Sequence, residues 1–507
     1  MTAAPGGGAG HPAAGATALG LVGAVVTVGA WARTGPTTPA TDPSSWFGLI
    51  GSRHQGDARV VVAEALLALG LVALGAGWWW LQRLAARGTA GLRATTTAWL
   101  LWSAPFALGP PLGSRDVWAY AAQGELVRRG LDPSQVPVSR LGPGPMLAAV
   151  DPRWRETKPP YGGLGVLLEH AAAAIAGGRP LPAVVALRVL AVLAVVVLVL
   201  GSARLARPEE RARVVILVGG CPPLLIHLVS GAHLDAVAAA LLVLALLLAG
   251  VRADHPAEPA GWRRCAAVAL CGVAATAKLF VLVAALWLTA AGVAALWRAS
   301  ATRRWRAAGA TVATDAAALA AGIVLASLAA GTGSGPLANL ATPGRLHTHL
   351  APVELAALVL GPLVPLDASQ TLAVTRAVGS AVAVVIAAWL VLRRTGSVAR
   401  LAGALAAVAV LGPVFYPWYL APVVPMSAVA GERARRALLV GGLALSAVTL
   451  PTPTPAVRLV RAHPLGAVLL LVVVVVAAAA AAGPAVRRGQ TSRRKRKNAA
   501  TASTTTA

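Results

Sequence analysis

The stretch AVVALRVLAVLAVVVLVLGSA, residues 183–203, contains a single charged residue, Arg188. A helix needs roughly 20 mostly apolar residues to cross a hydrocarbon core about 30 Å thick. This stretch therefore predicts a transmembrane helix, and the rest of the chain has the same character. Of its 507 residues, 57% are hydrophobic and 12% are charged, whereas about 25% are charged in a soluble protein. The composition excludes a soluble multidomain globule and a disordered chain, and it indicates an all-α polytopic membrane protein.

Apolar segments of this kind recur along the whole chain. Several have Pro or Gly at their ends, and irregular membrane helices occur where they line a cavity within the protein. Two shorter apolar segments, 163–176 and 352–364, end in Gly or Pro and are predicted to be non-spanning or re-entrant. The 14 predicted spans are residues 15–33, 60–82, 93–109, 183–203, 214–230, 234–251, 265–278, 279–297, 308–330, 374–392, 401–415, 418–431, 437–451 and 464–484.

The distribution of basic residues predicts the orientation of these spans. With the N-terminus inside, the predicted cytoplasmic segments hold 27 of the 44 Lys and Arg but only 5 of the 18 acids. The remainder holds 17 basic and 13 acidic residues. This asymmetry follows the positive-inside rule and predicts that both termini are cytoplasmic. The cytoplasmic segments are residues 83–93, 204–213, 252–264, 298–306, 393–400, 432–436 and the tail from 485.

The two ends of the chain are predicted to be tails. Residues 1–14 are rich in Gly, Ala and Pro and are expected to be disordered, and residues 15–484 are expected to form one transmembrane domain. No short apolar region with a cleavage site appears at the start, so the first helix is expected to be retained. The tail 485–507 contains RRKRK at 493–497. Such a cluster favours binding to anionic membrane lipid, and no nucleic-acid partner is expected.

Polar residues gather in three predicted external segments, 110–161, 331–351 and 415–419, of which the first is the richest. It combines Trp and Tyr with carboxylates, amides and Arg. Aromatic rings stack on the C–H face of a sugar and carboxylates accept its hydroxyls, whereas an interfacial aromatic belt does not account for so many acids and arginines. The predicted sugar-binding residues, inside and outside this segment, are Arg115, Trp118, Tyr120, Gln123, Trp154, Tyr161, His233, Asp235, Tyr416 and Trp418.

Asp116 is the strongest candidate for a catalytic residue. It follows the third predicted span and begins a stretch in which Asp116, Tyr120 and Gln123 recur at helical spacing, so that the three share one face. A carboxylate at the start of a helix also serves as an N-cap. The sequence leaves both roles open.

Ionisable residues in apolar surroundings are costly and are therefore candidates for function. His233 and Asp235 flank a turn between two spans; without a third ligand nearby, polar contacts at the turn are favoured over a metal pair. Lys278 lies at a break between two short helices, where it either extends to the interface or binds a lipid phosphate. Arg345 and His347, in the second external segment, are further candidates for that phosphate.

Four short stretches together resemble a known family. RDVWAYAAQG (115–124), GLDP (130–133), AVDPRWRET (149–157) and PYG (160–162) look like the actinobacterial polyprenol-phosphate-mannose-dependent α-1,6-mannosyltransferases, which are GT-C glycosyltransferases. The likeness is strongest over residues 110–165 and continues more loosely around 233–235, Lys278 and 415–419. One difference is Trp-Ala-Tyr at 118–120, where the family often has Tyr-Ser-Tyr.

The resemblance implies a GT-C-type fold in the plasma membrane with a site on the extracytoplasmic side. The family's essential Asp matches Asp116. The implied partners are a polyprenyl-phosphate-mannose donor and an α-1,6-mannan glycolipid acceptor, as in lipomannan and lipoarabinomannan synthesis. Together with the residues, this predicts inverting transfer to the 6-hydroxyl with Asp116 as general base. The donor phosphate would be bound by Lys278, Arg345 and His347, and neither a metal nor another cofactor is expected.

Three alternatives remain open from the sequence. Broken helices and intramembrane charges also suit a flippase or transporter of a lipid-linked sugar, although the two halves of the chain show no internal repeat. A GT-C enzyme that uses another polyprenyl-phosphate sugar would have the same pattern. A structural membrane scaffold is the third alternative, and the cluster around Asp116 argues against it.

Overall fold

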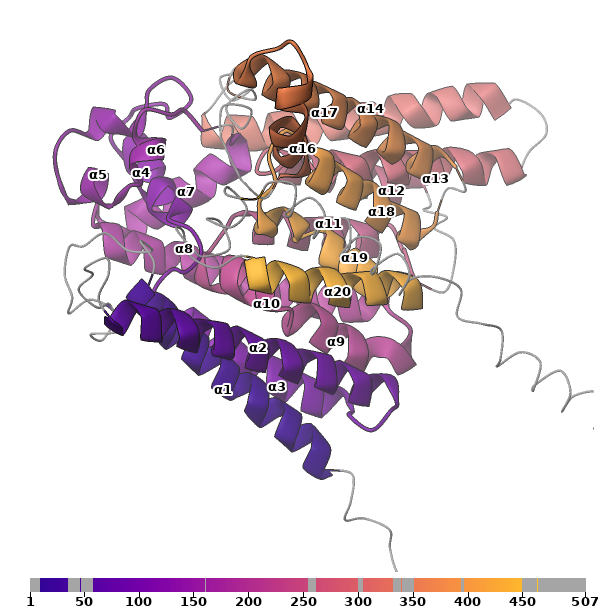
Figure 1. The fold of residues 1–507 in the computed structure, drawn as a ribbon. Helices are drawn as coiled ribbons and strands as arrows, with labels where there is room; N and C mark the ends of the chain where they lie inside the picture. The colour runs from indigo at the N-terminus through magenta and orange to yellow at the C-terminus, as the bar shows by residue number, and fades with distance from the viewer. Residues whose placement is uncertain are drawn as a thin grey trace, which may run out of the picture.

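The computed structural model describes residues 10–34, 46, 58–159, 161–253, 261–299, 304–331, 339, 351–393, 396–448 and 463. The regular secondary structure of these residues consists of helices, with no strands, which confirms the predicted all-α class (Figure 1). The predicted span 464–484 and the tail 485–507 lie outside the described residues.

Three long helices form one side of the molecule, along the lower face in Figure 1: α1 (Gly10–Thr34), α2 (Ala58–Ala86) and α3 (Leu92–Leu108). Small residues let α1 and α2 approach closely, as is common between membrane helices; a Cβ at Gly23 would lie 2.3 Å from the backbone nitrogen of Leu74. The predicted disordered tail is wrong for residues 10–14. Helix α1 already begins at Gly10 because Pro12 is compatible with a first helical turn and alanines follow it.

The central layer contains α8 (Pro180–Leu205), η2 (Pro208–Glu210), α9 (Arg211–Gly219), α10 (Pro222–Leu224), a π-helix η3 (Leu225–Ser230) and α11 (Asp235–Leu248). The predicted span 214–230 is not one helix. Its two parts meet at an angle of 51°, because Gly220 and the pair Pro222-Pro223 interrupt the helical hydrogen bonds.

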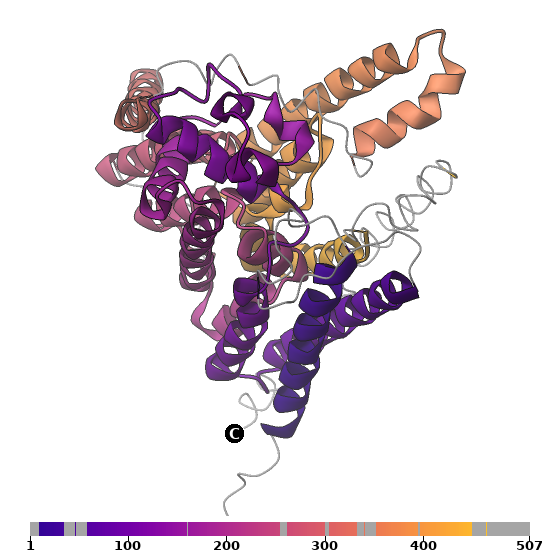
Figure 2. The same cartoon turned by 90° about the vertical axis from the view of Figure 1, so that its left-hand side faces the viewer.

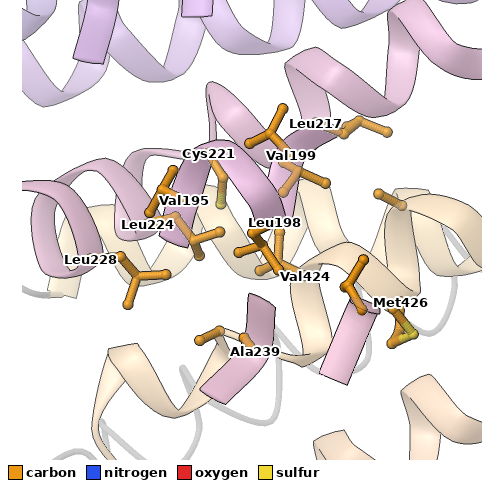
Figure 3. Close-up of a cluster of buried hydrophobic side chains, with 14 of the residues drawn as sticks. Val195, Leu198, Val199, Leu217, Cys221, Leu224, Leu228, Ala239, Val424 and Met426 are labelled. Atoms are coloured by element: carbon orange, nitrogen blue, oxygen red, sulfur yellow. The ribbon is translucent and has the colours of Figure 1, made fainter. Parts of the chain in front are cut away.

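The core lies where this layer meets α19 (Val423–Ala430). Figure 3 shows Leu198 from α8, Leu224 from α10, Ala239 from α11 and Val424 from α19 converging on one point. All four side chains are at most 2% exposed. Interlocking of segments so distant in sequence holds the N-terminal helices and the C-terminal helices in one body.

The predicted external segment 110–161 folds into short helices at one end of the molecule, which faces the viewer in Figure 2. These are α4 (Asp116–Arg128), η1 (Val138–Leu141), α5 (Pro145–Ala149) and α6 (Pro152–Arg155), followed by α7 (Gly163–Ala176). Helices α4 and α7 are in backbone contact, because a Cβ at Gly124 would lie only 2.0 Å from the carbonyl oxygen of Glu169.

Most of the remaining helices form the opposite side of the molecule, whereas α20 (Glu432–Val448) packs against α2, as a Cβ at Gly442 would lie 2.9 Å from the Trp78 ring (Figure 1). Buried ion pairs brace the helices of the opposite side: Arg264 lies 2.9 Å from Asp315 between α12 and α14, and Arg376 lies 2.6 Å from Glu354 between α17 and α16. Besides α20, the remaining helices are α12 (Gly261–Ala275), α13 (Val281–Ala299), α14 (Arg304–Ala330), α16 (Pro352–Leu360), η5 (Gly361–Leu363), α17 (Ala368–Leu392), α18 (Val398–Leu411) and η6 (Pro417–Leu420).

Six described helices are long and apolar enough to cross a membrane alone, and the bent pair α9 to η3 makes up to seven. Eleven predicted spans coincide with one helix each, but some of these helices are short. Helix α11, for example, has 14 residues and rises about 21 Å, less than the hydrocarbon core. The predicted span 418–431 consists of η6 and the eight-residue α19. The structure therefore supports a polytopic membrane protein, and the number of 14 spans stays a prediction.

Segments predicted to be cytoplasmic meet at the end of the molecule opposite α4. Arg213 lies 2.6 Å from Glu432, and Arg435 lies 2.6 Å from Glu210. These ion pairs join the segments 204–213 and 432–436. Two of the segments predicted to be cytoplasmic thus lie next to each other, while the side of the membrane that each group of loops faces stays a prediction.

Candidate active site

A cavity of about 330 Å³ lies between α4, α6, the α12–α13 turn and η6. It collects residues that are far apart in the sequence. The predicted site residues that line it are Asp116, Tyr120, Gln123, Trp154, Tyr161, Asp235, Lys278, Tyr416 and Trp418.

Asp116 is the first residue of α4, as the helical spacing predicts. The N-cap of this helix is Arg115 rather than Asp116. The Asp116 carboxylate instead accepts a hydrogen bond from the indole Nε1 of Trp154 at 2.9 Å, and its side chain is 14% exposed. The interpretation of Asp116 as an N-cap is therefore wrong, and the carboxylate faces the cavity.

Burial sets the ionisation behaviour of this carboxylate. It raises the pKa of Asp116 above the ordinary value, because burial disfavours the charged form. The hydroxyl of Ser114, the positive charge of Lys278 and the Trp154 hydrogen bond oppose the increase. The result is a carboxylate that accepts a proton more readily than an exposed one.

The chain before α4 is fixed against the π-helix. The hydroxyl of Ser230 donates to the carbonyl of Pro110 at 2.9 Å and accepts from the backbone N–H of Leu112 at 3.1 Å. Gly113 has a φ of +75°, and a Cβ there would lie 2.8 Å from Cε1 of His227. Glycine is therefore required at this position, and the turn delivers Asp116 to the cavity.

The stacked rings of Tyr416 and Trp418 form one wall of the cavity, and the ring of His233 stacks on Trp418 behind it. The His233 ring lies 3.9 Å from the Trp418 ring at 17°, and the Tyr416 ring lies 4.4 Å from the other side at 10°. His233 is fully buried and does not line the cavity. Burial lowers the pKa of its ring well below the usual value, which favours neutral imidazole. His233 thus supports Trp418 from behind the wall and approaches Asp116 at 3.8 Å, and its contact with sugar stays a prediction.

Lys278 occupies the turn between α12 and α13, and its side chain enters the cavity. The Lys278 Nζ lies 3.0 Å from Asp235 Oδ2, 3.4 Å from the hydroxyl of Tyr161 and 5.8 Å from the centre of the Tyr419 ring. The alternative in which Lys278 extends to the interface is therefore wrong. Asp235, predicted to bind sugar, is the counter-ion of Lys278, because it is the first residue of α11 and points towards the turn.

Besides His233, two predicted sugar-binding residues do not line the cavity. Arg115 donates to the carbonyl of Ala149 at 2.8 Å and so fixes the loop before α6. Trp118 is buried in the hydrophobic cluster beneath α4. It lies two residues after Asp116, and positions i and i+2 of a helix do not share a face. Arg345 and His347 lie outside the described residues.

The structure also places residues in the site that the sequence pattern did not predict. Lys158 and Tyr419 line the cavity, and Glu169 lies behind Gln123. The rarity of lysine in the sequence could have identified Lys158 as a candidate. The chain has 44 basic residues but only four lysines, at 158, 278, 495 and 497, and two of them line this one cavity. Lysine presents a compact point charge that suits phosphate.

Metal-binding side chains are scattered across the described ranges. Within them, no three or more His, Cys, Asp or Glu side chains are grouped so that they could hold a metal ion. What the cavity does offer is a carboxylate with a raised pKa, lysine side chains and stacked aromatic rings. Such a set can remove a proton from a hydroxyl, attract a phosphate and hold a sugar ring.

Comparisons with known proteins extend over most of the chain. Residues 16–332 match the family model described as "Alpha-(1->6)-mannopyranosyltransferase, N-terminal domain", and residues 350–483 match the "MptB C-terminal domain". The chain is 32% identical over 363 residues to a probable alpha-(1->6)-mannopyranosyltransferase of Mycolicibacterium smegmatis, a match that covers 65% of this chain and 64% of the relative.

Two further relatives come from other actinobacteria. The chain is 30% identical over 383 residues to an alpha-(1->6)-mannopyranosyltransferase of Mycobacterium tuberculosis, covering 65% of this chain and 64% of the relative. It is 28% identical over 368 residues to alpha-(1->6)-mannopyranosyltransferase B of Corynebacterium glutamicum, covering 68% and 60%. The chain thus spans less than two thirds of the length of these relatives. No solved structure matches.

Proposed function

Because this chain belongs to the alpha-(1->6)-mannopyranosyltransferase family, we propose that it transfers mannose from polyprenyl-phosphate-mannose to an α-1,6-mannan glycolipid. The reaction takes place at the extracytoplasmic face of the plasma membrane, and the acceptor is the 6-hydroxyl of the terminal mannose. One observation carries this proposal: the Asp116 carboxylate faces the same cavity as Lys278 and the stacked rings of Tyr416 and Trp418.

Asp116 acts as the general base. It takes the proton of the acceptor hydroxyl while that oxygen forms a bond to the anomeric carbon of the donor. The bond from this carbon to the phosphate oxygen breaks at the same time, so a β-linked donor gives an α-glycoside. The raised pKa of Asp116 supports this role, because a base works best when its pKa approaches the working pH.

The cations of the cavity stabilise the leaving phosphate. Negative charge grows on its oxygens as the glycosidic bond breaks, and preorganised positive groups lower the barrier of such a step. Lys278 and Lys158 line the cavity and are placed for this role. Arg345 and His347 stay predictions for the same role. The proposal needs no metal, because a lipid monophosphate carries less charge than a nucleotide diphosphate.

An apolar groove supports a lipid-linked donor. It has a volume of about 870 Å³ and lies between α13, α14 and α17. All its lining residues except Thr289 and Arg298 are apolar. The groove begins on α13 at Val283, one turn after Phe280, which lines the cavity. A prenyl chain in this groove would keep its phosphate within reach of Lys278.

A transfer assay tests the proposal. The full-length protein is reconstituted in liposomes with radiolabelled polyprenyl-phosphate-mannose and octyl α-1,6-mannobioside as acceptor. We expect a trisaccharide that is cleaved by an α-1,6-mannosidase. Movement of the labelled lipid across the bilayer without any glycoside product would favour the transporter instead. Transfer only from glucosyl or arabinosyl donors supplied in parallel would refute mannose as the donated sugar.

Replacement of Trp154 tests the environment of the base. Trp154→Phe removes a hydrogen bond to the carboxylate, so we expect kcat/KM to fall by about 10-fold. This bond lowers the pKa of Asp116. Its loss raises that pKa further, and since Asp116 must be ionised, the acid limb of the pH profile shifts to higher pH. Trp262→Phe, at a side chain 73% exposed, is the control. If the acid limb of Trp154→Phe does not shift, the ionisation of Asp116 does not cause this limb of the pH profile.

A further inference from the structure

A buried carboxyl group lies directly behind the cavity wall. Glu169 belongs to α7, whose residues are apolar except for Glu169 and His170, and its side chain is 0% exposed. It is not among the residues that line the cavity. Burial of a carboxyl group among apolar side chains is costly unless it is hydrogen-bonded. A partner for Glu169 must therefore come from the elements packed on α7.

That partner is Gln123 on α4. With its nitrogen oriented towards α7, the Gln123 amide donates to the two carboxylate oxygens of Glu169 at 3.3 and 3.2 Å. Gln123 itself lines the cavity. The amide has one nitrogen and one oxygen, so Glu169 leaves the oxygen available on the cavity side. The backbone contact at Gly124 keeps α4 and α7 in place. It therefore holds Glu169 beside Gln123 and fixes the orientation of the Gln123 amide.

The position of Gln123 on α4 indicates which part of the substrate it meets. It follows Asp116 by seven residues, a rise of about 10 Å along a helix, and it comes one turn after Tyr120. The hydroxyl of Tyr120 lies 3.4 Å from that of Tyr161, which in turn lies 3.4 Å from Lys278 Nζ. Gln123 is thus on the side of the cavity where Lys278 is placed to hold the phosphate, which is where the donated sugar would lie.

We propose that Glu169 is a positioning residue that fixes the amide of Gln123 as a hydrogen-bond acceptor for a hydroxyl of the donor sugar. This rests on the proposed function of the cavity. A fixed acceptor selects a free hydroxyl over an analogue that lacks it, since the amide oxygen is then left without a partner in a buried wall. Gln123 and Glu169 together therefore set donor specificity, whereas Asp116 carries out the chemistry.

The test compares polyprenyl-phosphate-mannose with its four monodeoxy analogues in the full-length protein. We expect the wild type to discriminate against one analogue by about 10-fold in kcat/KM. Gln123→Leu abolishes this discrimination, and Glu169→Gln weakens it by about threefold, because a second amide accepts either orientation of Gln123. Glu169→Gln preserves the volume of the side chain and so guards against misfolding.

Two controls distinguish selection of the donor from a general loss of activity. His170→Gln, next to Glu169 on α7, should leave the discrimination unchanged. A purely structural role for Glu169 would lower the rates with all donors equally, and that result overturns the inference. Discrimination between the donor and its analogues is also measured as the ratio of their equilibrium binding constants, with short-chain lipid-phosphate-mannose and its monodeoxy analogues. Loss of discrimination in binding supports the inference even if no mannose is transferred, in which case only the proposed function fails.

Discussion

We expect Asp116→Asn to lower kcat for the proposed mannosyl transfer by about 10²–10⁴-fold, the usual contribution of a general base, with little effect on folding. Asparagine has the same size as aspartate, and its amide oxygen can still accept the hydrogen bond from Trp154 Nε1 that the carboxylate now accepts. It cannot take a proton from the acceptor hydroxyl. The prediction is measured in the reconstituted transfer assay under saturating donor and acceptor.

A matched control for Asp116 lies in the same external segment. Asp132 accepts a hydrogen bond from the backbone N–H of Ser134 at 2.8 Å, a turn contact that asparagine also makes. Asp132→Asn should therefore retain normal activity. Wild-type rates in Asp116→Asn would remove Asp116 from the role of base, and equal losses in both variants would indicate a general effect of charge.

We expect Lys278→Met to abolish the proposed transfer and also to destabilise the protein. It leaves Asp235 buried without the cation that lies 3.0 Å away, and breaking one partner of a buried ion pair costs about 3–5 kcal/mol. The double variant Lys278→Met, Asp235→Leu removes both charges, so we expect it to regain thermal stability. It should remain inactive, because the contribution of Lys278 to the leaving phosphate is still missing and Lys158 alone does not replace it. Thermal unfolding in detergent and the transfer assay measure the two effects separately.

The Arg264–Asp315 pair provides the control for this experiment. This pair is also buried and joins α12 to α14, but neither residue lines the cavity. Arg264→Met should lower the unfolding temperature, and the double variant Arg264→Met, Asp315→Leu should restore stability together with activity. An active Lys278→Met, Asp235→Leu protein would show that Lys278 serves the fold alone.

Much of the fold could be predicted because the membrane restricts the choice of secondary structure. A backbone in hydrocarbon must satisfy its own hydrogen bonds, so long apolar segments such as 183–203 form helices. The ends and breaks were harder to predict. The span 214–230 is broken at Gly220 and the two prolines that follow Cys221, and α1 begins at Gly10 rather than after residue 14. The apolar content of a segment indicates that it is buried in the membrane or the protein, but it does not indicate where a helix bends.

The site was predictable in part. Polar clustering and helical spacing identified Asp116, Tyr120 and Gln123, which lie along one helix and share a face. The partner of Lys278 and the acid behind Gln123 could not be found in the same way. Both contacts join different helices, and the sequence does not state where two helices cross. Arg115 and Trp118 do not line the cavity, since nearness to Asp116 in the chain does not place a side chain there.

By itself, the sequence determined that this protein is an all-helical membrane protein, that a helix begins at Asp116, and that the chain resembles a family of mannosyltransferases. Only the tertiary structure decided that Asp116 faces a cavity instead of capping its helix, that Asp235 neutralises Lys278, and that Glu169 lies against Gln123. Periodicity specifies the apolar face of one helix. The meeting of two faces depends on close contacts between helices, such as the one that Gly124 permits between α4 and α7.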